Sequence, residues 1–91
     1  MAKELILHGM VQGVFCRKYC SQYARKMRIR GSASNLYDGT VRVLLDTEDE
    51  NTVHAFIQSL KSNPMGYSFY GRIDSVDVRD YGGAIRGDYQ F

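Results

Sequence analysis

The spacing of apolar side chains along the chain alternates between the period of a strand and the period of a helix. Leu5–Leu7 form a short apolar run that ends near Gly9, which is typical of a buried central strand. From Cys16 to Met27, apolar residues recur every three or four positions, as they do on one face of an amphipathic helix. The first third of the chain therefore predicts a strand that leads almost directly into a helix, with Gly31 beyond the helix exit.

The next segment has the pattern of two strands joined by a tight turn. Residues at about 30–36 lead into Asp38-Gly39, a dipeptide that favours tight turns between strands. Apolar residues at 41, 43 and 45 then alternate with polar ones, which is the pattern of a half-buried strand. We expect Asn35 to lie at the end of the strand that precedes the turn.

A second helix is predicted after this strand. Thr47 and Glu50 have the spacing of a capping box, in which the Thr47 hydroxyl bonds forward to the backbone and Glu50 reaches back. Asn63-Pro64 ends the helix. Its apolar face is formed by Val53, Phe56, Ile57 and Leu60.

The last third of the chain predicts a loop and two strands. The aromatic, glycine-rich segment 63–71 has no clean period and is interpreted as a loop that alters access to any nearby site. Imperfect alternation over 73–78 predicts a strand, Gly82-Gly83 breaks it, and residues 88–91 add a short final strand. The order is β-α-β-β-α-β with an extra strand. Right-handed crossovers would place both helices on one face of an antiparallel sheet, so we expect an α+β, ferredoxin-like sandwich in a single domain, 1–91.

Composition narrows the function classes. A formal charge of +2 is too small to indicate a nucleic-acid partner, and no apolar run is long enough to span a membrane. The first residues lead into a strand rather than a signal peptide, so a cytoplasmic location is expected. Cys16 and Cys20 lie one helical turn apart, which fits neither a disulfide framework nor a zinc motif, and they are expected to be free thiols in the core.

The link between the first strand and the first helix has the features of a phosphate-binding loop. It contains Gly13 and ends with Arg17 in the first turn of the helix. Backbone N–H groups of such a turn and of a helix start form a concave cradle for an anion, and an arginine adds a planar fork that matches phosphate oxygens. A positive charge at this position opposes the helix dipole unless an anion is present. The candidate phosphate-binding residues are Gln12, Gly13, Val14, Phe15, Cys16 and Arg17.

Two motifs resemble those of the acylphosphatases, small enzymes that hydrolyse carboxylic-phosphoric mixed anhydrides. The second motif is Asn35 followed by Asp38 and Gly39. The first family motif reads Gly-x-Val-Gln-Gly-Val-x-x-Arg, and its fixed positions are occupied by Gly9, Val11, Gln12, Gly13, Val14 and Arg17. The resemblance covers essentially the whole chain. It implies that Arg17 binds the phosphate of an acyl phosphate and that Asn35 positions the attacking water.

The chemistry of these residue types is compatible with that implied reaction. An acyl phosphate departs as a carboxylate, which is stable near neutral pH, so the reaction needs no general acid. Asn35 is neutral and too weak to act as a base, but its amide can both accept from and donate to a water in line with phosphorus. No cluster of His, Cys, Asp or Glu has metal-site spacing, so we expect neither metal nor cofactor. A monomer with a small-molecule substrate is expected.

Other interpretations remain open at this stage. Arg17 could be a solvated helix residue, Asn35 a strand-end residue that bonds to the turn, and His8 an ordinary strand side chain rather than a base. The aromatic content would also suit a ferredoxin-like RNA-binding module, although no strand carries a ribonucleoprotein motif. A phosphate- or carbamoyl-phosphate-binding module with little turnover, such as the acylphosphatase-like domain of hydrogenase-maturation proteins, is a third possibility. Whether the terminal carboxylate approaches Arg17 is left open.

Overall fold

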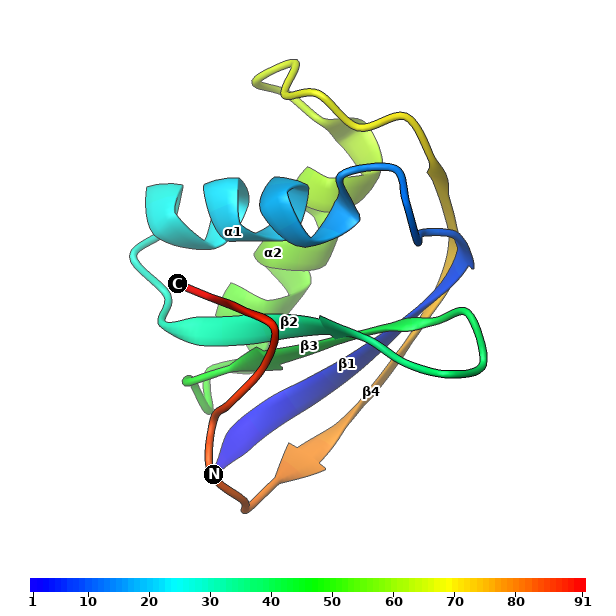
Figure 1. Cartoon of the computed structure of the whole chain (residues 1–91). Coiled ribbons are helices and arrows are strands. Elements are labelled where there is room, and N and C mark those ends of the chain that lie inside the picture. The colour runs from blue at the N-terminus through cyan, green and yellow to red at the C-terminus, as the bar shows by residue number, and fades with distance from the viewer.

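The computed structural model describes all residues, 1–91, and has two layers, a sheet and a pair of helices packed on one of its faces (Figure 1). The strands are ordered β4-β1-β3-β2-β5, and every neighbouring pair is antiparallel. This arrangement confirms the predicted ferredoxin-like fold with its extra strand. In chain order the elements are β1 (Ala2–Met10), α1 (Cys16–Lys26), β2 (Gly31–Asn35), β3 (Val41–Leu45), α2 (Glu50–Ser62), β4 (Arg72–Tyr81) and β5 (Tyr89–Gln90).

The core lies between the sheet and the helices. Leu5 and Leu7 of β1 are fully buried there, because side chains two positions apart point to the same face of a strand. Tyr19 of α1 and Phe56 of α2 are also fully buried in this layer. Cys16 and Cys20 are free, buried thiols, as the helical stripe predicted. Neither helix is long and apolar enough to cross a membrane.

A bulge explains the imperfect alternation of β4. The pairing of β1 with β4 shifts after His8, so that Ser75 opposes His8 while Ile73 opposes Gly9. One extra residue, Asp74, is therefore accommodated in β4. Gly9 has φ +130, and a Cβ there would lie 2.3 Å from the carbonyl oxygen of Arg72. Glycine is required at this position because β4 passes against the backbone just before the cradle.

The start of α2 differs from the prediction. The N-cap is Asp49 rather than Thr47, and its carboxylate accepts a hydrogen bond from the N–H of Asn51 at 3.0 Å. The Thr47 hydroxyl instead accepts from the N–H of Asp49. The predicted capping box is wrong because Asp49, two residues later, is an equally good capping residue and sits directly before the helix.

Residues 82–88, here called the C-terminal strap, connect the two edges of the sheet. β4 lies at one edge and β5 at the other, and the strap connects them by passing the N-terminal end of β1 before it reaches β2 (Figure 1). The buried Ser32 hydroxyl donates to the carbonyl of Arg86 at 2.9 Å. After the strap, the backbone of Phe91 exchanges two hydrogen bonds with Gly31. The chain end is therefore held beside the start of β2.

Candidate functional site

The loop between β1 and α1 forms a concave row of backbone N–H groups. Gly13 (φ +74) and Phe15 (φ 67) both adopt the left-handed conformation, which is a feature of loops whose backbone N–H groups gather around an anion. Tyr19 is the first residue of the segment whose N–H is bonded within the protein, to the carbonyl of Phe15. The N–H groups from 12 to 18 find no acceptor there, and no side chain caps the helix. Unbonded N–H groups at a helix start have the chemistry that an anion requires, so the structure leaves the predicted cradle free to accept one.

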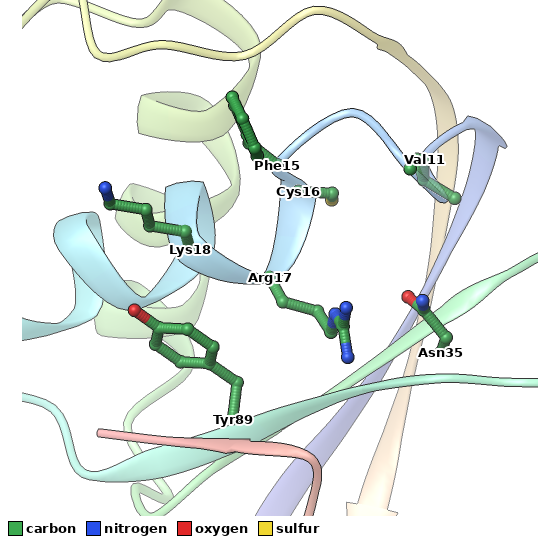
Figure 2. A pocket seen from close by; sticks show the side chains of 8 residues that line it. Val11, Phe15, Cys16, Arg17, Lys18, Asn35 and Tyr89 are labelled. Atoms are coloured by element: carbon green, nitrogen blue, oxygen red, sulfur yellow. The ribbon is translucent and has the colours of Figure 1, made fainter.

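The cradle borders a pocket of about 340 Å³. Arg17, from the first turn of α1, and Asn35, from the end of β2, direct their side chains toward each other across it (Figure 2). The pocket is lined by Val11, Gly13, Phe15, Cys16, Arg17, Lys18, Asn35 and Tyr89. The structure thus brings together five of the predicted site residues, which are Gly13, Phe15, Cys16, Arg17 and Asn35.

Gln12 and Val14 do not line the pocket, and both have other contacts. The Gln12 amide nitrogen donates to the carbonyls of Leu36 at 2.6 Å and Thr40 at 2.9 Å. These bonds fasten the cradle to the β2–β3 turn, directly after Asn35. Val14 accepts a backbone hydrogen bond from Tyr70 at 3.2 Å. The N–H groups of both residues stay unbonded, so their predicted place in the cradle remains a prediction; sequence reasoning missed that their other contacts join the cradle to two other loops.

The Asn35 side chain has an unsatisfied acceptor. Its Oδ1 is buried and has no hydrogen-bond partner in the protein. Buried polar atoms in folded proteins are nearly always paired, so this unpaired oxygen at the edge of the pocket is an unusual feature of Asn35. Its backbone N–H is engaged and donates to Asp88 Oδ2 at 3.2 Å.

Asp88 also contacts Arg17. The same carboxylate oxygen lies 3.4 Å from Arg17 Nη1, and both side chains are partly exposed. The terminal residue Phe91 pairs through its backbone with Gly31 instead. An internal carboxylate therefore accompanies Arg17. Sequence reasoning missed Asp88 because it lies 71 residues from Arg17 and belongs to no motif.

Lys18 and Tyr89 complete the pocket on the side of Arg17 away from Asn35 (Figure 2). Lys18 adds a second positive charge at the helix start. Tyr89 reaches the pocket because β5 pairs with β2, opposite Ala33. Neither residue was predicted, since Tyr89 is brought here by the strap and Lys18 has the pattern of an ordinary solvated helix residue.

The loop 63–71 packs beside the cradle. The rings of Phe15 and Tyr70 lie 5.6 Å apart between centroids, and 58% and 70% of these residues are exposed. A Cβ on Gly71 would lie 1.9 Å from the carbonyl oxygen of Met10. The loop is therefore held closely against the β1–α1 segment, and its effect on access to the pocket stays a prediction.

Other titratable groups near the motif have structural surroundings. His8 Nε2 lies 2.8 Å from an oxygen of Asp77 on the neighbouring strand and does not line the pocket. This placement favours the interpretation of His8 as a strand side chain. A hydrogen bond with Cys16 and burial raise the pKa of the Cys20 thiol. No three His, Cys, Asp or Glu side chains gather in a group that could hold a metal ion.

The sequence and the fold of this chain are similar to those of known proteins. A family model described as acylphosphatase matches residues 3–90. An acylphosphatase of Corynebacterium glutamicum is 39% identical over 70 residues, which cover 77% of this chain and 73% of that protein. An acylphosphatase of Archaeoglobus fulgidus is 38% identical over 82 residues, covering 89% and 91%. The crystal structure of acylphosphatase from Bacillus subtilis superposes with a TM-score of 0.72 at 27% identity, covering 94% of this chain and 93% of that one.

Proposed function

The chain belongs to the acylphosphatase family, a family of hydrolases that act on phosphorus-containing acid anhydrides, and from this membership we propose how its residues hydrolyse an acyl phosphate. The products are a carboxylate and inorganic phosphate. The observation that carries the proposal is the convergence of Arg17, Asn35 and a row of unbonded N–H groups on one pocket. Each of these three parts has a separate role in the reaction.

The cradle and Arg17 bind the phosphoryl group. The N–H groups at the start of α1 donate to its oxygens, and Arg17 supplies charge-assisted hydrogen bonds. Only Nη1 of the guanidinium contacts a carboxylate, at 3.4 Å, so its other donors are available to the substrate. In phosphoryl transfer, charge develops on the equatorial oxygens, and donors fixed in advance stabilise it without reorganisation.

Asn35 positions the nucleophile. Its side-chain amide, which borders the pocket, hydrogen-bonds to a water and so orients a lone pair of that water toward phosphorus. The water oxygen bonds to phosphorus while the bond between phosphorus and the acyl oxygen breaks, and the electron pair leaves on the carboxylate. The water proton is released to the phosphate product or to solvent. Asn35 needs no charge for this role.

The leaving group needs no proton donor from the protein. A carboxylic acid has a pKa of about 4, so its anion departs readily at neutral pH. We propose that the enzyme acts as a cytoplasmic monomer on a small-molecule acyl phosphate, without a cofactor.

Hydrolysis of benzoyl phosphate in the presence of a chelator tests the proposal. Arg17→Ala is expected to lower kcat by about 10²- to 10³-fold, as the loss of an oxyanion donor does elsewhere, and to abolish inhibition by phosphate. Asn35→Ala is expected to lower kcat comparably but to retain phosphate inhibition. Arg30→Ala removes an equal charge from an exposed residue outside the pocket and serves as the control. An inactive wild type, or equal activity in all four proteins, would contradict the assignment.

A further inference from the structure

We infer that Asp88 is a positioning residue of the active site, whose carboxylate holds the Arg17 side chain and the end of β2 in their working arrangement. The inference rests on the proposed function. A single oxygen of Asp88, Oδ2, lies 3.4 Å from Arg17 Nη1 and 3.2 Å from the backbone nitrogen of Asn35. Asp88 thus connects the phosphate-binding arginine to the residue that orients water. No other side chain is hydrogen-bonded to both residues.

The carboxylate is itself held by the C-terminal strap. The N–H of Asp88 donates to the buried hydroxyl of Ser34 at 3.0 Å. One residue earlier, a Cβ on Gly87 would lie 2.5 Å from Ser34 Oγ and 2.9 Å from the Cβ of Ser32, so only glycine allows this approach. Tyr89 follows at once and pairs with β2. The backbone of Asp88 is therefore fixed by the neighbouring residues on both sides, whereas a solvated surface aspartate has no such constraint.

The path of the strap brings Asp88 to the end of β2 that Arg17 faces. The backbone of Phe91 is bonded to Gly31 at 2.8 and 2.9 Å, which keeps the chain end beside the start of β2. Arg17 faces the other end of that strand, where Asn35 lies. Asp88 reaches this end because the strap arrives at the β2 edge before β5 begins, where Arg86 and Asp88 bond to Ser32 and Ser34. None of the residues that line the pocket is acidic.

A carboxylate in this position has two opposing effects. It restricts the rotamers of a long, flexible arginine side chain, which orients the guanidinium before substrate arrives. It also repels the negatively charged phosphoryl group that shares Arg17. Asp88 therefore favours turnover through orientation while it weakens phosphate affinity. A residue needed only for folding would not separate these two quantities.

The test compares Asp88→Asn with Asp80→Asn, which makes the same change at an exposed carboxylate of β4 that pairs with Lys3 of β1, away from the pocket. Asparagine at position 88 still offers an oxygen to the N–H of Asn35 but carries no charge for Arg17. For benzoyl phosphate hydrolysis, we expect kcat of Asp88→Asn to fall by about 10-fold, with inhibition by inorganic phosphate equal or stronger. Asp80→Asn is expected to remain within about twofold of the wild type, as surface substitutions usually do.

Two further variants keep the test informative if Asp88→Asn folds poorly. Ser34→Ala loosens the strap without touching the carboxylate and should show the same split, a lower kcat with unweakened phosphate inhibition. In an Arg17→Ala background, Asp88→Asn should lower kcat far less than it does in the wild type, because the partner of the carboxylate is already absent. An Asp88→Asn enzyme with wild-type kcat would overturn the inference. A lower kcat accompanied by weaker phosphate inhibition would overturn it as well.

Failure of this inference differs from failure of the proposed function. If the proposed function is wrong, the wild type does not hydrolyse benzoyl phosphate, or Arg17→Ala remains as active as the wild type. If only the role of Asp88 is wrong, the wild type is active, Arg17→Ala is not, and Asp88→Asn behaves like Asp80→Asn.

Discussion

Replacement of Gln12 by alanine tests whether the cradle and the β2–β3 turn act as one unit. The Gln12 amide donates to the carbonyls of Leu36 and Thr40, and alanine removes both bonds. Each carbonyl keeps another partner, since Leu36 accepts from the N–H of Gly39 and Thr40 accepts from the N–H of Leu36. The substitution therefore costs the net value of two hydrogen bonds, without the larger penalty of an orphaned carbonyl.

The magnitude follows from those two bonds. At roughly 0.5–1.5 kcal/mol each, their loss lowers the free energy of unfolding by about 1–3 kcal/mol. A domain of 91 residues is stable by roughly 5–14 kcal/mol, so Gln12→Ala should still fold. A loss near the middle of that range lowers Tm by about 8–16 °C. Asn35 directly precedes the released turn, so kcat should also fall by about 10-fold, while the cradle retains phosphate.

Urea unfolding and benzoyl phosphate kinetics would be measured on the same preparations. Gln58→Ala is the matched control, because Gln58 is exposed on α2 and its side chain makes no hydrogen bond. Gln12→Glu is a second variant, since its carboxylate faces two carbonyl oxygens and should destabilise the protein more than alanine at pH 7. If Gln12→Ala matches Gln58→Ala in both stability and kcat, the link between cradle and turn has no energetic value and the reasoning fails.

Three further predictions concern stability. Gly71→Ala should lower Tm far more than Gly13→Ala, because a Cβ at Gly71 meets a β1 carbonyl oxygen at 1.9 Å while Gly13 has open space and only its φ of +74 opposes alanine; equal Tm values would refute this. Tyr19→Phe should cost about 1–3 kcal/mol in urea unfolding, since its buried hydroxyl donates to an α2 carbonyl at 2.6 Å, and an unchanged midpoint would contradict it. Hydrogen bonds from the Thr52 hydroxyl and a backbone N–H lower the pKa of Asp49, so its ionised form stabilises the fold above the unfolded pKa of about 4 and loses that effect as pH falls through the lower folded value. The stability difference between wild type and Asp49→Ala should accordingly shrink between pH 7 and pH 2, and a constant difference would argue against an ionised cap.

Much of the fold was predictable because its determinants are local. Burial on one face imposes a period of two on strands and about 3.6 on helices, so the order of elements follows from the apolar pattern. The determinants of the predicted cradle are also local, since Gly13 and the helix that begins at Cys16 lie within one short segment. Where two local solutions competed, prediction failed, and Asp49 rather than Thr47 became the N-cap.

The contacts that assemble the pocket could not be predicted from apolar periodicity or from local motifs. Gln12 meets carbonyls 24 and 28 residues away, and Asp88 meets Arg17 across 71 residues. Periodicity reports which face of an element is buried, but it carries no information about which distant side chain is brought opposite. Amino-acid order along the chain was thus sufficient to predict the elements that bring Arg17 and Asn35 to one pocket. Their hydrogen-bond partners were established only by the packing of the sheet and the path of the strap to the β2 edge, because these contacts depend on the positions of whole strands relative to one another.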